Sequence, residues 1–193
     1  MVGAIPDNFP ALVDRASREF GSTEAISDGD VSLDFAELGQ QIREAAGALV
    51  ASGVKRGDRV AVWAPNSWEW VVAAMAVFRV GAVLVPVNTR FKGREAAFVL
   101  KKANVKLLFT LVGFIGYNYG TALTDTGEKV DSIDDIVVLR GDVLEGTVSF
   151  QDFLNRNTDV GFDEAESRAA AVSGSDLGLI MFTSGTTAVS YTH

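Results

Sequence analysis

The sequence predicts an α/β fold with a mostly parallel sheet flanked by helices. Short apolar runs rich in valine, isoleucine and leucine alternate along the chain with longer segments of helical periodicity. Parallel strands need a crossover connection, which is usually a helix. The composition agrees, because 48% of the 193 residues are hydrophobic and 22% are charged, as is typical of a globular domain with a real core.

The expected strands share a short β-branched or leucine-rich run bounded by turn residues. They lie near residues 59–63, 82–87, 105–110, 135–140 and 177–182, and the last is expected to be buried. Helical patterns occupy residues 34–53, 68–80, 94–103 and 150–156. Residues 111–135 have no steady period, which predicts a loop with a short helix.

The first helical pattern has clear boundary signals. Its apolar stripe, at steps of three and four residues, consists of Phe35, Leu38, Ile42, Ala45 and Leu49. Asp34 followed three residues later by Glu37 resembles a capping box, and Gly53 suits the left-handed position after the helix. Ser67 is expected to cap the next helix.

The charge and residue counts exclude several classes of protein. Lysine and arginine total 17 against 25 acidic residues, so a net charge of −8 argues against binding nucleic acid. The absence of cysteine excludes disulfides and thiolate nucleophiles. Residues 1–20 do not resemble a secretory signal, and the longest apolar run, Val71–Phe78, is far short of the roughly 20 residues of a membrane span. We therefore expect a cytoplasmic protein without a transmembrane segment.

The segment after the last expected strand carries the strongest chemical signal. Residues Thr183, Ser184, Gly185, Thr186 and Thr187 place four hydroxyls and a glycine at the end of that strand. Ligands bind at the carboxyl edge of parallel sheets, and the exposed amides of a glycine-containing loop can hold an anion. The pattern predicts a phosphate-binding loop, with a helix-capping loop as the alternative.

Other motifs are missing or do not fit. There is no Gly-Lys dipeptide, so a P-loop is absent, and no G-x-G-x-x-G occurs. Phe182 and Thr186 stand where a G-x-S-x-G elbow around Ser184 would need glycines. The single histidine, His193, is the last residue, which argues against a Ser-His-Asp hydrolase.

Three other segments have an ordinary interpretation that we prefer. Trp68 and Trp70, beside a helical apolar run, are expected to be core aromatics. The acidic run at residues 131–135 lacks calcium-loop spacing and predicts a solvated turn. Residues 113–120, with three glycines and two tyrosines, predict a surface loop, and a loop facing the substrate is the alternative.

The motif FTSGTT resembles the Ser/Thr/Gly-rich phosphate loop of the adenylate-forming (AMP-binding) superfamily. Residues 32–70 are similar to the first helix, G-V-x-x-G-D-x-V turn and P-N corner of that family, and residues 78–88 to the strand that follows. The resemblance runs from about Phe20 to Thr187. It is greatest to the bacterial acyl-CoA synthetases that act on fatty or steroid-derived acids.

The resemblance implies a two-step ligase. A carboxylic acid attacks the α-phosphate of ATP, pyrophosphate leaves, and coenzyme A captures the acyl-adenylate. In that scheme Thr183–Thr187 hold the β- and γ-phosphates and Mg²⁺ shields their charge, so the loop works by positioning and electrostatics. No nucleophile from the protein is required, and we assign no catalytic residue and no metal ligand within the chain.

The sequence also departs from the family pattern. The family loop continues with glycine, a variable residue, proline, lysine and glycine, whereas Ala188 follows Thr187 directly. Either a short segment is missing there or residues 188–193 are unrelated to the family. We therefore interpret residues 1–187 as the N-terminal part of an AMP-binding domain and residues 188–193 as a tail of uncertain origin.

The rest of the family machinery has no candidate in this stretch, including the adenine-binding strand, the Mg²⁺ ligand and the C-terminal domain with its catalytic lysine. We expect the chain alone to be inactive, and to form a homodimer or to pair with missing domains. The alternative function is a non-catalytic, self-associating α/β module that has lost the chemistry.

Overall fold

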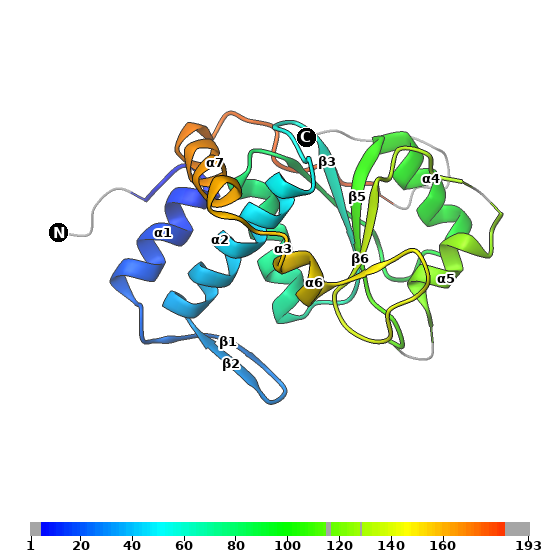
Figure 1. Ribbon diagram of the computed structural model, residues 1–193, viewed down its shortest axis with the longest axis horizontal. Helices are drawn as coiled ribbons and strands as arrows, with labels where there is room; N and C mark the ends of the chain where they lie inside the picture. Colours follow the sequence, from blue (N-terminus) through cyan, green and yellow to red (C-terminus); the bar gives the residue numbers. More distant parts are fainter. Residues whose placement is uncertain (1–4, 115–116, 128, 184–193) are drawn as a thin grey trace.

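The computed structural model describes residues 5–114, 117–127 and 129–183, arranged as a sheet with helices on both faces (Figure 1). The sheet is parallel, with five strands in the order β4-β3-β5-β6-β7. Its strands are β3 (Arg59–Trp63), β4 (Val83–Pro86), β5 (Val105–Thr110), β6 (Asp135–Val138) and β7 (Val148–Ser149). The predicted fold class is therefore confirmed, as are the first four predicted strands.

Two groups of helices cover the sheet. One face carries α1 (Phe9–Glu19), α2 (Phe35–Ala51), α3 (Trp68–Arg79), α6 (Phe150–Leu154) and α7 (Asp159–Ala171), and the other carries α4 (Gly93–Ala103) and α5 (Tyr119–Thr124) (Figure 1). A separate antiparallel hairpin, β1 (Glu24–Asp28) and β2 (Val31–Asp34), precedes α2. Because both faces of the sheet are covered, its strands are apolar along almost their whole length.

Alternate residues of each strand enter two separate cores. Val60 and Val62 of β3 face the core under α2 and α3, whereas Ala61 and Trp63 face the core under α4. On β5, Phe109 belongs to the first core and Leu108 to the second. This period of two is the direct result of strand geometry.

The predicted helix boundaries are confirmed where a capping signal was present. The Glu37 amide donates to Asp34 Oδ1 at 2.8 Å and the Asp34 amide donates to Glu37 Oε2 at 3.0 Å, which completes the capping box of α2. Gly53 follows α2 with φ of 79°, a value that glycine adopts most easily. The Trp70 amide donates to Ser67 Oγ at 3.2 Å at the start of α3.

The prediction of a buried strand at 177–182 is wrong. The segment lies parallel to β4 through one bridge, Leu84 to Leu179, in which Leu84 N donates to the Gly178 carbonyl and Ile180 N donates to the Leu84 carbonyl. One side of the segment packs on the core, but Leu177, Leu179 and Met181 are 53%, 37% and 53% exposed. An apolar run at the edge of a sheet has the same sequence signature as a central strand, so the pattern did not distinguish them.

Four further features were not predicted from the sequence. They are α1, α7, the short strand β7 and the β1–β2 hairpin, which turns at Gly29 with φ of 61°. Helix α7 is rich in acidic and alanine residues and has little apolar periodicity, so its pattern gave no clear helical stripe. Within the described residues, no helix is long and apolar enough to cross a membrane.

A glycine in the middle of α2 allows a close approach to the turn before α7. A Cβ at Gly47 would lie 1.9 Å from Asn157 Oδ1 and 2.7 Å from Asn157 Cγ. The Asn157 Oδ1 atom is itself buried without a hydrogen-bond partner. Glycine is a poor helix former. It is nevertheless required at position 47, since any side chain there would displace Asn157.

We expect Gly47→Ala to lower the free energy of unfolding by about 1–3 kcal/mol, the usual cost of overpacking, although alanine favours helices. Urea unfolding of the purified chain measures this. The double variant Gly47→Ala/Asn157→Ala should recover most of the loss, because it removes the side chain that the new methyl group meets. A Gly47→Ala variant as stable as the original chain would contradict the packing.

Candidate functional site

The carboxyl edge of the parallel sheet is the candidate site. Strands β3, β4 and β5 end there at Trp63, Pro86 and Thr110. The segment 177–182 runs in the same direction beside β4, and its bridge pairs Leu179 with Leu84. Thr183 therefore follows the end of this segment at the same edge, where it is exposed.

Only the first residue of the predicted phosphate loop lies within the described structure. Thr183 is placed at the edge where ligands bind in parallel α/β sheets. Ser184, Gly185, Thr186 and Thr187 lie outside the described residues. Their role in holding phosphate thus stays a prediction.

Three aromatic side chains pack together at this edge: Trp63, Tyr117 and Tyr119. We call this cluster the aromatic floor. Trp63 is fully buried at the end of β3, and its Nε1 donates to the Asn88 carbonyl at 3.2 Å. Its ring centroid lies 5.0 Å from that of Tyr119 and 6.4 Å from that of Tyr117, in edge-on geometry. Phe182 packs against the same core, which ties the segment before Thr183 to this floor.

The hydroxyl of Tyr119 stays protonated in this setting. Burial raises the pKa of Tyr119, and the neighbouring Tyr117 raises it further. The hydroxyl donates to the Thr89 carbonyl at 3.4 Å. The cluster thus fixes the backbone of the loop that follows β4 at two carbonyls, those of Asn88 and Thr89.

That loop carries positive charge to the same edge. Arg90, Lys92 and Arg94 are exposed where the loop enters α4, and the Lys92 Nζ lies 4.8 Å from the ring centroid of Tyr117. The nearby Glu95 carboxylate accepts a hydrogen bond from the Lys92 amide at 2.8 Å, so it is already engaged at the helix start. An exposed threonine, three cations and a rigid aromatic floor suit an anionic ligand.

Possible metal ligands do not gather in the described part of the chain. No group of three or more acidic or histidine side chains is close enough there to hold a metal ion. In the acidic run at 131–135, Asp134 pairs with Lys106 at 2.9 Å and Asp135 pairs with Arg156 at 2.6 Å. The solvated turn that the sequence predicted is therefore fixed by ion pairs.

The sequence interpretation predicted the packing of two tryptophans on the opposite core, but it missed the aromatic residues at this edge. Trp68 and Trp70 pack against the core, as predicted. Tyr119, in the segment predicted as a surface loop, is only 2% exposed. Trp63 was not singled out, although its place at the end of a strand was a signal that could have found it.

The parallel sheet and the cationic, hydroxyl-bearing carboxyl edge define an α/β protein that is suited to a phosphate-containing ligand. Residues 13–190 match the family of AMP-binding enzymes. The chain belongs to this family, which confirms the resemblance found in the sequence.

Two relatives are the 3-[(3aS,4S,7aS)-7a-methyl-1,5-dioxo-octahydro-1H-inden-4-yl]propanoyl:CoA ligases of Rhodococcus jostii and Mycobacterium tuberculosis. The first is 41% identical over 94% of this chain and 36% of its own length. The second is 35% identical over 92% of this chain and 34% of its own length. A medium-chain acyl-CoA ligase of Danio rerio is 28% identical over 84% of this chain and 28% of its own length. The chain thus spans about a third of the length of these relatives.

Solved structures share the fold. The anthranilate CoA ligase AuaEII in complex with anthranoyl-AMP aligns with a TM-score of 0.81 and 22% identity, over 95% of this chain and 33% of the other. A Mycobacterium tuberculosis fatty acyl CoA synthetase aligns with a TM-score of 0.75 and 22% identity, over 92% of this chain and 33% of the other. At this level of identity the likeness supports the fold alone.

We expect Trp63→Phe to lower the free energy of unfolding by about 1–3 kcal/mol, because it removes the hydrogen bond to the Asn88 carbonyl and leaves space in the buried floor. Trp70→Phe is the matched control, since Trp70 is only partly buried on the other core. Urea unfolding of both variants measures the difference. Equal losses in the two variants would contradict the special role of Trp63.

Proposed function

We propose that the chain is part of an ATP-dependent acyl-CoA synthetase, an acid–thiol ligase that activates a carboxylic acid as its acyl-adenylate and transfers it to coenzyme A. The observation that carries the proposal is the position of Thr183, at the carboxyl edge of a sheet that belongs to the AMP-binding enzymes. The named activities of the relatives support the same reaction class. A fatty or steroid-derived acid is the proposed substrate.

In this proposal the loop Thr183–Thr187 holds the β- and γ-phosphates of ATP through hydroxyls and backbone amides. Arg90 and Lys92 add positive charge from the neighbouring loop, which attracts the polyphosphate to this edge. The protein then contributes orientation and charge neutralisation, and the acid itself is the nucleophile.

Mg²⁺ is part of the proposed reaction, but the described residues offer no group of side chains that could hold it. We therefore assign no step to the metal from these residues. Coenzyme A would take the acyl group in the second step. Residues 1–187 are proposed as the N-terminal part of the AMP-binding domain, residues 188–193 as a tail of uncertain origin, and the cytoplasm as the compartment.

A second candidate function follows from a specific surface. Leu177, Leu179 and Met181 form an exposed apolar row along the segment beside β4, which we call the edge row. Exposed apolar rows at a sheet edge recruit partners. The alternative is thus a non-catalytic α/β module that associates with itself or with other domains through the edge row.

The reaction class is tested by acid-dependent exchange of pyrophosphate into ATP, using the longer protein that carries this sequence and a panel of fatty and steroid-derived acids. We expect exchange with at least one acid in the longer protein and none with residues 1–193 alone. No exchange with any acid would favour the non-catalytic module. Exchange by the chain alone would contradict its expected inactivity.

The phosphate loop is tested in the same longer protein by the triple variant Thr183→Val/Thr186→Val/Thr187→Val. We expect the exchange rate to fall by about 10²-fold, because the variant removes donors to the charge that develops in the transition state. Thr23→Val is the control, since Thr23 is an exposed threonine in the turn before β1. Equal rates in the triple variant and the original protein would refute the phosphate role.

Self-association is tested by light scattering on the chain at about 100 μM, a concentration at which exposed apolar edges associate. We expect a dimer or larger species, and we expect Leu177→Ser/Leu179→Ser/Met181→Ser to shift it to the monomer. Phe98→Ser is the control, because Phe98 is 54% exposed on α4, away from the edge row. A monomeric original chain would rule out association through the edge row.

A further inference from the structure

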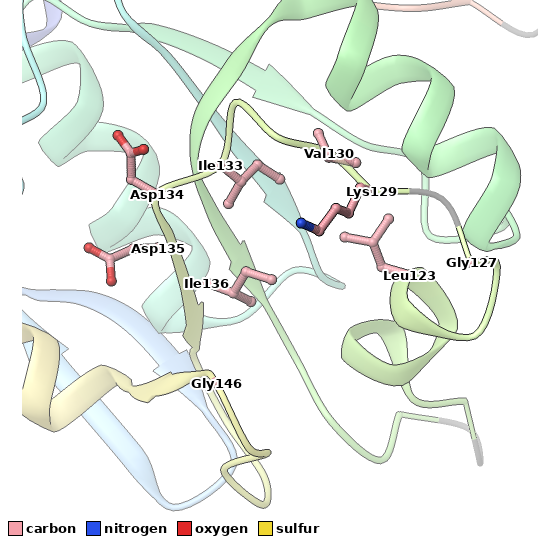
Figure 2. A pocket seen from close by; sticks show the side chains of 9 residues that line it. All are labelled: Leu123, Gly127, Lys129, Val130, Ile133, Asp134, Asp135, Ile136 and Gly146. Atoms are coloured by element: carbon pink, nitrogen blue, oxygen red, sulfur yellow. The ribbon is translucent and has the colours of Figure 1, made fainter.

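A cavity opens beside the start of β6. Its volume is about 430 Å³, within the range of small-molecule sites. The apolar wall consists of Leu123, Val130, Ile133 and Ile136, and Lys129 also lines the cavity. Figure 2 shows these side chains converging from α5, the segment before β6 and β6 itself.

The cavity lies at the amino end of β6, whereas Thr183 lies at the carboxyl edge of the sheet. Helix α4 packs over β5, whereas Ile136 of β6 lines the cavity together with Leu123 of α5 and with Val130 and Ile133 of the connecting segment. This segment is irregular, so it leaves a hollow over the sheet that a packed helix would fill.

The exposed Lys129 side chain brings a positive charge to this cavity. Figure 2 shows its nitrogen among the apolar side chains of Ile133, Ile136 and Leu123. Within the part of the chain that the structure describes, Lys129 makes no hydrogen bond or ion pair. A carboxylate that reaches this exposed amine can form a charge-assisted hydrogen bond with it.

The two carboxylates at the cavity do not supply that anion. Asp134 pairs with Lys106 at 2.9 Å, and Asp135 receives two hydrogen bonds from Arg156 at 2.6 and 3.1 Å. In Figure 2 both carboxylates point away from Lys129, on the other side of β6. Their charge is thus already neutralised by other cations.

We propose that this cavity binds an amphipathic monocarboxylate, with its carboxylate on Lys129 and its hydrocarbon body against Leu123, Ile133 and Ile136. The lining requires both parts of the ligand. Inorganic phosphate would pair with the lysine but leave the apolar wall exposed to water, and a neutral alcohol would cover the wall but leave the ammonium without an anion. The inference does not depend on the proposed ATP chemistry.

Isothermal titration of the 193-residue chain with octanoate tests the site, with 1-octanol and inorganic phosphate as comparison probes. We expect octanoate to bind, and the two comparison probes to bind at least about tenfold more weakly, because each lacks one half of the interaction. Lys129→Gln should weaken octanoate binding by about tenfold or more, and Lys129→Arg should retain most of it. Lys55→Gln is the matched control, since it removes an exposed lysine from the turn before β3.

A second variant separates the cavity from surface charge. Ile133→Phe keeps the lysine and fills part of the hollow, so it should abolish octanoate binding while the unfolding midpoint in urea stays close to that of the original chain. Absence of octanoate binding in the original chain would overturn the proposal. Equal affinity for octanoate and octanol, or an unchanged affinity in Lys129→Gln, would overturn it as well.

Discussion

The Arg79 side chain, at the end of α3, is 2% exposed and is bonded to carboxylates from two other helices. Its Nη1 donates to Asp14 Oδ1 of α1 at 2.9 Å, and its Nη2 donates to Glu166 Oε2 of α7 at 2.6 Å. Because the Arg79 guanidinium is buried, loss of either carboxylate would leave part of its charge uncompensated and destabilise the fold. The first and last helices of the described chain are therefore fixed on the same point of α3.

The position of the candidate site depends on this arrangement. After α7 the chain is held by Arg56, which donates to the Ala171 carbonyl at 3.0 Å and to Asp176 Oδ2 at 2.6 Å. The following residues then run beside β4 and bring Thr183 to the carboxyl edge, next to the aromatic floor. In the proposed function this loop acts by positioning, and a rigid approach would hold its hydroxyls beside the phosphates.

The sequence predicted the elements that carry their signals locally. The capping box of Asp34 and Glu37 and the apolar run of β3 lie within a few residues, so helix α2 and the central strands were predicted correctly. The Arg79 network was not predicted, because Asp14 and Glu166 are 65 and 87 residues away from the arginine. The edge position of residues 177–182 and the burial of Tyr119 likewise depend on which elements pack together, which local periodicity does not encode. At the candidate site, the hydroxyl-rich segment was visible from the sequence, whereas its aromatic floor became visible only in the fold.

In the proposed function, residues Thr183–Thr187 hold the polyphosphate of ATP at this sheet edge. A crystal structure of the longer protein with a non-hydrolysable ATP analogue tests it most directly. We expect the β- and γ-phosphates within hydrogen-bond distance of the Thr183–Thr187 amides and hydroxyls, at the carboxyl ends of β3, β4 and β5. A triphosphate bound elsewhere, with this loop making no contact to it, would contradict the claim.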